Sequence, residues 1–224
     1  MTVLIFANGD ISEVEWIRPY LAAPTAVIAA NGGTRHLWQL QHRPDVVIGD
    51  LDSLPQEAQD WLEAAGTTVH VYPHDKNETD LELALLHAIS HYEDDIQIFG
   101  AIGGRLDQTL ANIMLLAHPA LLERQIELVT EHQRAWLVTD RTEVEGEAGD
   151  TLSLVPIGGD VLVQETSGLR WPLSNELLAV GPALGISNEM TGSLAMIIVD
   201  SGTLLCILSD HRWQRLDSIT AAYP

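Results

Sequence analysis

The chain has 224 residues, of which 46% are hydrophobic and 19% are charged, a balance that permits a packed core and argues against disorder. Its 32 acidic and 11 basic residues give a formal net charge of −21. Such a negative field opposes binding to a nucleic-acid backbone, whereas it attracts divalent metal ions and cationic ligands.

Short apolar runs in the first half of the chain predict strands at residues 2–8, 25–31, 45–50, 67–72 and 96–101. The runs show little alternation of apolar and polar residues, which is typical of strands covered on both faces. Helical patterns lie between them, so we expect a parallel α/β sheet.

Two helices are predicted most clearly. In the first, at residues 79–92, Thr79 and Glu82 have the spacing of a capping box, and apolar side chains follow in one stripe. The second is expected at residues 105–117 and ends near a His-Pro pair at residues 118–119.

The pattern changes after about residue 135 to short strands punctuated by glycines, with no long helix. We therefore expect two domains, an α/β domain at residues 1–138 and an all-β domain at residues 139–224. The tail after Ser209 is compatible with a strand, a short helix or an ordered arm.

The cysteine content and the lengths of the apolar runs indicate the cellular compartment in which the protein works. Cys206 is the single cysteine, so no disulfide can form within the chain, as suits a reducing compartment. The N-terminus lacks the pattern of a secretory signal, and no apolar run reaches the roughly 18 residues of a membrane span. We expect a cytoplasmic protein with neither a membrane nor a nucleic acid as its partner.

Polar residues follow each predicted strand, at the sheet edge where open parallel sheets bind ligands. Asp50 and Asp52 follow the third strand and lie two residues apart, so in an extended segment both carboxylates can reach one cation. A loop that carries charge for solubility is the alternative. Asp80, in the first turn of the 79–92 helix, is a third candidate, although a carboxylate there also complements the helix dipole.

Glycines and cations at the same edge indicate phosphate binding. The pairs Gly32-Gly33 and Gly103-Gly104 allow phosphate to approach backbone N–H groups, and Lys76 and Arg105 can neutralise its charge. Together with carboxylates for Mg²⁺, this set predicts phosphoryl-type transfer from a nucleotide. The motifs GxxxxGK[ST] and GxGxxG are absent, which argues against a P-loop enzyme and a dinucleotide redox enzyme.

Six blocks of the sequence, in order, resemble the thiamine pyrophosphokinase family. "ANGGTRHLWQLQHRPDVVIGDLDSL", "DKNETDLELAL" and "GGRLDQTLANI" look like its three catalytic signature blocks. "GDTLSLVPIGG", "TSGLRWPL" and "GISNEMTGSLAMIIVDSGTLLCIL" resemble its thiamine-binding β-domain.

The resemblance implies a Rossmann-like catalytic domain followed by a β-sandwich domain, in a homodimer. Thiamine would lie between the catalytic domain of one subunit and the β-domain of the other. The implied reaction converts ATP and thiamine into AMP and thiamine diphosphate, with Mg²⁺ as the cofactor.

The family's functional positions can be carried onto this chain residue by residue. The resemblance implies metal binding and catalysis by Asp50, Asp52 and Asp80, and catalysis by Arg105 and Asp107. It implies ATP or phosphate binding by Asn31, Gly32, Gly33, Arg35, Ser53, Lys76, Thr79, Gly103, Gly104 and Gln108. It implies thiamine binding by Trp171, Ser187 and Asn188. An aromatic face such as that of Trp171 can hold the thiamine cation, although a core tryptophan on a strand is the alternative.

Three positions depart from the common family pattern, namely Asn31, Asn77 and Gln108, and each removes an acidic or titratable group. We expect tolerated variants in an active enzyme, because Asn still offers a ligand oxygen and Gln still forms hydrogen bonds. Two other functions remain open. One is pyrophosphate transfer to another heterocyclic alcohol, such as a hydroxymethylpterin, and the other is a sensor that binds thiamine or a nucleotide without turnover.

The nine histidines also raise the question of a transition-metal site. His87 and His91 have the i, i+4 spacing of metal ligands on the predicted 79–92 helix. Spacing suggests no third ligand, so a solvated helix face is the favoured interpretation.

Overall fold

The computed structural model describes residues 2–49, 54–64, 66–73 and 75–211. The chain forms two compact units, residues 1–131 and 132–224. No helix among the described residues is long and apolar enough to cross a membrane.

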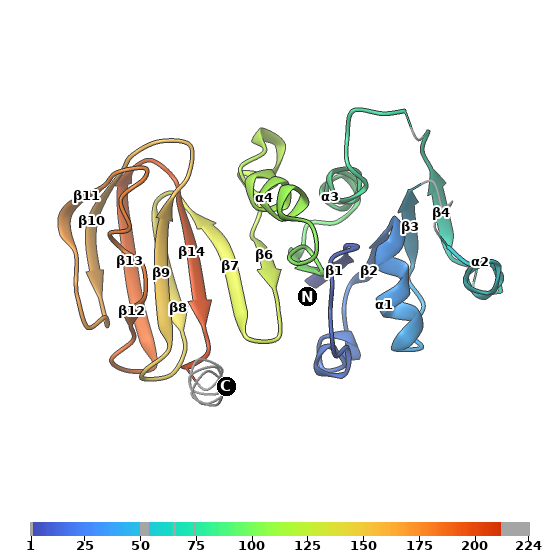
Figure 1. Cartoon of the computed structure of the whole chain (residues 1–224), viewed down its shortest axis with the longest axis horizontal. Coiled ribbons are helices and arrows are strands. Elements are labelled where there is room, and N and C mark those ends of the chain that lie inside the picture. The colour runs from blue at the N-terminus through green and yellow to red at the C-terminus, as the bar shows by residue number, and fades with distance from the viewer. Residues whose placement is uncertain (1, 50–53, 65, 74, 212–224) are drawn as a thin grey trace, which may run out of the picture. The chain divides into compact units, whose positions relative to one another are not determined.

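Unit 1 contains a sheet of six parallel strands in the order β6-β5-β1-β2-β3-β4 (Figure 1). The strands are β1 (Thr2–Phe6), β2 (Ala26–Ala30), β3 (Val46–Gly49), β4 (Thr68–Val71), β5 (Asp95–Phe99) and β6 (Ile126–Val129). The order reverses between β1 and β5, because β2 to β4 extend the sheet on one side of β1 and β5 and β6 extend it on the other. Open α/β sheets bind their ligands at such a reversal.

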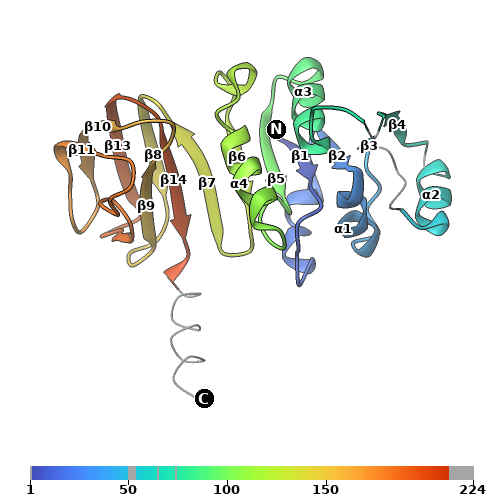
Figure 2. The same cartoon turned by 45° about the horizontal axis from the view of Figure 1, so that its top comes forward.

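Helices cover both faces of this sheet (Figure 2). The helices are α1 (Thr34–Gln39), α2 (Gln56–Glu63), α3 (Asp80–His91), α4 (Leu106–Leu115) and the short 3₁₀ turns η1 (Glu15–Ile17), η2 (Tyr20–Ala22), η3 (Asn31–Gly33) and η4 (Pro119–Leu121). On one face, Leu4 and Phe6 pack in a core with α1 and α2. On the other, α3 packs on β1, β2 and β3 through a buried stripe that begins at Leu81.

The five strands and two helices predicted for this unit are confirmed, with one exception in their burial. The expectation that all five strands are covered on both faces is wrong for β4, where Val69 is 37% exposed and Val71 is 68% exposed. β4 pairs with β3 alone and forms the edge of the sheet, so its apolar side chains lack a neighbour on the other side.

Unit 2 is an antiparallel β-sandwich, and the expectation of an all-β domain is confirmed. One sheet has the order β12-β9-β14-β7 and the other β11-β10-β13-β8. The strands are β7 (Gln133–Val138), β8 (Arg141–Glu145), β9 (Thr151–Pro156), β10 (Val161–Ser167), β11 (Ser174–Leu178), β12 (Asn188–Glu189), β13 (Leu194–Ser201) and β14 (Leu204–Ser209). Alternate side chains from both sheets form one core, which includes the Cys206 thiol.

The units divide after Glu131, whereas the sequence suggested a division after residue 138. The difference is β7, which pairs with β14 along its whole length and so belongs to the sandwich.

Candidate active site

A cavity of about 430 Å³ lies at the carboxyl ends of the unit 1 strands, beside the reversal between β1 and β5. Residues 7–10 after β1, residues 30–31 at the end of β2 and residues 79–81 at the start of α3 line it. The rest of the lining comes from the end of β5 into α4, namely Ala101, Gly103, Gly104, Arg105, Gln108 and Asn112. Seven of the residues predicted for the site therefore line one cavity: Asn31, Thr79, Asp80, Gly103, Gly104, Arg105 and Gln108.

Asp80 is the carboxylate that the structure holds most firmly at this cavity. One of its oxygens accepts a bond from the Lys76 ammonium at 2.8 Å, and the other accepts one from the Asn31 amide at 3.1 Å. An aspartate at position 31 would have no side-chain N–H to donate, so Asn31 positions Asp80 in a way that an aspartate would not. Each Asp80 oxygen keeps a lone pair for a further ligand.

Local structure explains why Asp80 and its neighbours point into the cavity. Thr79 caps α3, because its hydroxyl accepts a bond from the Glu82 amide at 3.1 Å. The cap fixes the first turn of the helix, and Asp80 is the first residue of that turn. Asn31 has a positive φ of 43°, which asparagine tolerates better than most residues and which turns the chain sharply after β2.

The loop after β5 supplies backbone and charge to the opposite wall. Gly103 and Gly104 have φ values of 115° and 71°, a region in which L side chains are strained. Arg105 pairs with Asp107 at 2.5 Å, and both side chains are well exposed. The hydrogen bond from Arg105 holds the pKa of the Asp107 carboxyl below its ordinary value, so this group stays ionised.

Four other predicted phosphate-binding residues that the structure describes are not on the cavity wall, namely Gly32, Gly33, Arg35 and Lys76. Gly32 and Gly33 are buried, and a Cβ on Gly33 would lie 1.9 Å from the Phe6 carbonyl oxygen, so close packing against β1 explains this glycine. Arg35 donates to the carbonyl oxygens of Asn8 and Gly9, both at 3.0 Å, and thereby braces the loop after β1.

Asp50, Asp52 and Ser53 lie outside the described residues. The last described residue before them is Gly49, at the end of β3. They remain predicted metal-binding and phosphate-binding residues.

The loop after β1 contributes site residues that the sequence did not single out. Asn8 and Asp10 line the cavity, as does Asn112 of α4, whose amide donates to the Ala101 carbonyl at 2.8 Å. The signal for Asn8 and Asp10 was the polar run that follows the first strand. His36 contacts this loop, because its Nε2 lies 2.9 Å from the Gly9 carbonyl oxygen. Burial lowers the pKa of the His36 imidazole.

The residues predicted for thiamine lie in unit 2, where two of them contact each other. The buried Asn188 side chain accepts from the Trp171 amide at 3.0 Å and donates to the Trp171 carbonyl at 2.6 Å. The Trp171 ring is 52% exposed, with the Arg170 guanidinium carbon 4.7 Å from its centroid. Ser187 is exposed and has a positive φ of 57°. Asn188 therefore positions the main chain that carries the exposed aromatic ring.

The chemistry of the cavity suits a metal-bound polyphosphate. Carboxylate and amide oxygens are ligands for a hard divalent cation, and Lys76 and Arg105 can neutralise phosphate oxygens. The Gly104 N–H in the loop before α4 offers a further donor, whereas the Gly103 N–H donates to the Thr109 hydroxyl at 3.2 Å.

Comparison with known proteins agrees with this chemistry. The profile of the thiamin pyrophosphokinase catalytic domain matches residues 17–130, and that of the thiamin pyrophosphokinase vitamin B1 binding domain matches residues 139–204. The chain is 30% identical to the thiamine pyrophosphokinase of Bacillus subtilis over 210 residues, which covers 93% of this chain and 98% of the relative. The chain belongs to the thiamine pyrophosphokinase family.

Solved structures show the same relationship. The crystal structure of the thiamine pyrophosphokinase from Bacillus subtilis superposes with a TM-score of 0.84, 30% identity and coverage of 94% of this chain and 99% of that one. The thiamin pyrophosphokinase from Geobacillus thermodenitrificans gives a TM-score of 0.82 and 29% identity, with coverage of 94% and 98%. The family therefore accounts for both units of the chain.

Proposed function

We propose that this chain transfers pyrophosphate from ATP to the hydroxyl of thiamine, giving thiamine diphosphate and AMP. The observation that carries the proposal is the cavity at the reversal of the unit 1 sheet, with Asp80 held by Lys76 and Asn31 on one wall and the glycine loop and Arg105 on the other. The thiamine oxygen forms a bond to the β-phosphorus of ATP, and the bond from that phosphorus to the oxygen of AMP breaks. The protein's task is to align these atoms and to neutralise the phosphate charge.

We propose Mg²⁺ as the metal, with Asp50, Asp52 and Asp80 as its protein ligands. The oxygen-rich wall fits a hard cation that is usually held by one or two carboxylates together with substrate phosphates. Such a cation would draw charge from the phosphates as they react. Within the protein, Lys76 and Asn31 keep the Asp80 carboxylate aimed at the cavity.

We propose that unit 2 binds thiamine through Trp171. Its exposed ring offers a face to the thiamine cation, an interaction worth about 0.5–2 kcal/mol. Arg170 occupies a position over this ring, so bound thiamine takes the other face or displaces the guanidinium. The buried amide of Asn188 holds the Trp171 backbone in either case.

We also propose a homodimer. Every residue of α4 is at least partly exposed, and Leu106, Leu110 and Met114 form an apolar stripe on it with exposures of 73%, 54% and 50%. Three such residues at i, i+4 and i+8 share one face of a helix and suit contact with another protein surface. The enzyme is expected in the cytoplasm, where its buried thiol stays reduced.

The test is a turnover assay with thiamine, ATP and Mg²⁺ that resolves AMP from ADP and detects thiamine diphosphate. Thiamine-dependent AMP formation in step with thiamine diphosphate supports the proposal. A folded protein that binds thiamine without turnover would instead be a sensor. Turnover of a hydroxymethylpterin but not of thiamine would move the activity to another alcohol.

A further inference from the structure

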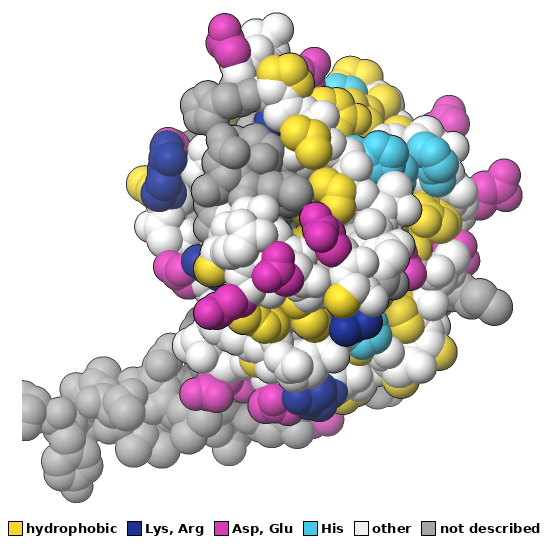
Figure 3. Space-filling model, turned by 90° about the vertical axis from the view of Figure 1, so that its right-hand side faces the viewer, with side chains coloured by type: hydrophobic (Ala, Val, Ile, Leu, Met, Phe, Trp, Pro, Cys, Tyr) yellow, Lys and Arg dark blue, Asp and Glu magenta, His cyan; other side chains and the backbone are white. Residues whose placement is uncertain are grey.

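Three histidine rings lie together at the edge of unit 1, away from the cavity. His87 and His91 lie one turn apart on α3, and their ring centroids are 4.0 Å apart. The third ring is that of His70 on β4, whose centroid is 5.0 Å from that of His87. Figure 3 shows histidine side chains, in cyan, adjacent to one another on this face.

The fold places His70 toward α3. In the parallel register His70 lies opposite Ile48 of β3, and α3 packs over β3. Neighbouring side chains on paired strands share a sheet face, so His70 projects to the side that α3 covers. The third candidate ligand, which spacing within the helix did not supply, thus comes from a strand, 17 residues before His87.

Two of the three rings have no hydrogen-bond partner. Within the described part of the chain, the His70 and His87 imidazoles take part in ring contacts and in no hydrogen bond. The His91 Nδ1 lies 2.9 Å from the His87 carbonyl oxygen and 2.8 Å from the Ser90 hydroxyl, and in the tautomer that donates to the carbonyl the proton is on Nδ1. Its Nε2 is therefore left with a free lone pair, an arrangement common among metal-bound histidines.

The His87 imidazole is held in its neutral form. Burial, together with the neighbouring His91 and His70 rings, lowers the pKa of His87 to about 4. A neutral imidazole is the form that binds metals. In the structure the His87 and His91 rings are stacked with an interplanar angle of 22°, so their nitrogens do not converge on one point. Coordination of one ion requires the rings to turn about their side-chain torsions, which are broad at the histidine Cβ–Cγ bond.

We propose that His70, His87 and His91 form a binding site for a borderline divalent transition metal of the Zn²⁺ class. Three imidazoles with water in the fourth position satisfy the tetrahedral preference of this ion. A metal there joins the edge strand β4 to α3. The site is separate from the proposed Mg²⁺ site, because Asp80 begins α3 and His91 ends it, roughly 16 Å further along the helix axis.

Titration of tag-free protein with ZnCl₂ in excess Mg²⁺ tests the proposal by calorimetry. Mg²⁺ occupies carboxylates but competes poorly for imidazoles, so binding to the acidic surface is suppressed. We expect one Zn²⁺ per chain, and we expect His70→Ala and His91→Gln each to weaken it by at least about tenfold. The control is His118→Gln, because His118 lies outside the cluster and its loss should leave the affinity unchanged.

Two results would overturn the site. One is an affinity for Zn²⁺ that is the same in His70→Ala as in the unmodified chain, and the other is the absence of any stoichiometric binding. Should a variant fail to fold, Co²⁺ added to the unmodified protein gives a second readout by NMR. We then expect Co²⁺ to broaden the ring signals of His70, His87 and His91 more than those of the other histidines. Equal broadening of all nine histidine signals would reject the site. Because Zn²⁺ binding is measured without thiamine or ATP, its failure would leave the proposed pyrophosphate transfer untouched.

Discussion

At the scale of single residues, the carboxylate of Asp80 is the feature on which the proposed chemistry depends most directly. We predict that Asp80→Asn lowers turnover by about a hundredfold, as loss of an electrostatic catalytic group typically does. The measurement is kcat for thiamine-dependent AMP formation, with folding checked by circular dichroism. Asp95→Asn is the matched control, since Asp95 is exposed at the opposite end of β5 from the cavity. Equal kcat values for the two variants would remove Asp80 from the reaction.

Trp171 is proposed to contact thiamine, whereas Asn188 supports the main chain of Trp171. We predict that Trp171→Ala raises KM for thiamine far more than KM for ATP and leaves Tm nearly unchanged, because the ring is half exposed. Asn188→Ala should raise the same KM and also destabilise the fold by about 1–3 kcal/mol, since it leaves the Trp171 main-chain groups without their buried partner. Kinetics and thermal unfolding of both variants check the pair. If Asn188→Ala lowers Tm without changing either KM, the amide has a structural role alone.

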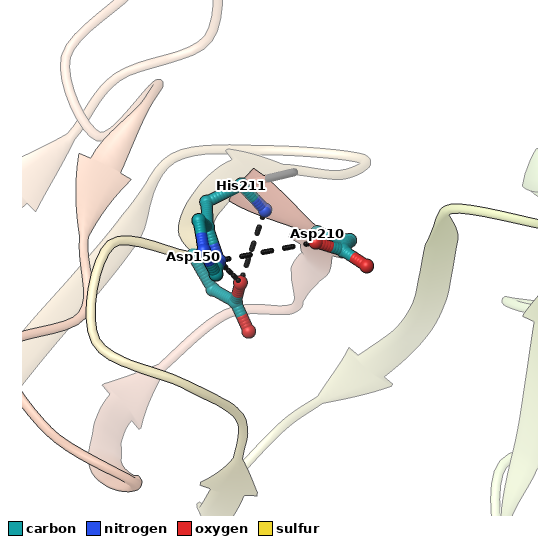
Figure 4. Close-up of side chains that lie close together, drawn as sticks. All are labelled: Asp150, Asp210 and His211. Atoms are coloured by element: carbon teal, nitrogen blue, oxygen red, sulfur yellow. Dashed lines mark hydrogen bonds and ion pairs between the residues drawn. The ribbon is translucent and has the colours of Figure 1, made fainter. Parts of the chain in front are cut away.

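At the scale of elements, Asp150 joins the start of β9 to the end of β14 (Figure 4). One carboxylate oxygen accepts from the His211 main-chain nitrogen at 3.0 Å and from its ring Nδ1 at 2.8 Å, and the other accepts from the Glu147 amide at 2.8 Å. Burial acts to raise the pKa of Asp150, but these hydrogen bonds outweigh it and hold the pKa below its ordinary value of 3.8.

A lowered folded-state pKa means that the ionised form stabilises unit 2 above the ordinary pKa, and that this stability is lost as pH falls through the folded value. We predict that Asp150→Asn reduces the free energy of unfolding at pH 7, and that the difference from the unmodified chain narrows as the pH falls below 3.8. Urea unfolding at a series of pH values measures both. Asp200→Asn, at an exposed position of β13, should show no such trend. A constant difference at every pH would contradict the assignment.

Some helices and strands could be predicted from the sequence and others could not. α3 was predictable because its cap, Thr79, and its apolar stripe are both local signals. α1 and α2 were not, since 6 and 8 residues are too few to establish a helical period. The exposure of β4 depends on where the sheet ends, a property of strand order that an apolar run does not encode.

The candidate site likewise has features that could be predicted from the sequence and features that could not. Its position at the strand ends follows from the general behaviour of parallel sheets, and seven of the fifteen residues that line the cavity were predicted. The bond between Asn31 and Asp80 and the clamp of Asn188 on Trp171 join residues 49 and 17 positions apart in the chain. Such contacts are set by folding, and they give both asparagines a positioning role that the sequence did not predict.

At the scale of the whole molecule, the proposed dimer makes a prediction that neither unit makes alone. If the catalytic unit of one subunit works with the thiamine-binding unit of the other, two defective chains can restore one intact site. A dimer of one Asp80→Asn chain and one Trp171→Ala chain then holds one site with both defects and one with neither. Since random exchange makes half of the dimers mixed, we predict recovery of about a quarter of the unmodified activity.

The experiment unfolds and refolds the two variants together and compares their activity with that of the same variants refolded separately and then mixed. Separate refolding controls for residual activity, and gel filtration confirms that dimers form in both samples. If each subunit instead builds its site from its own two units, every site in the mixture carries one defect, and the activity will equal the mean of the two variants. If α4 forms the interface, Leu110→Glu will place a charge within its apolar stripe, yield monomers and abolish the recovery.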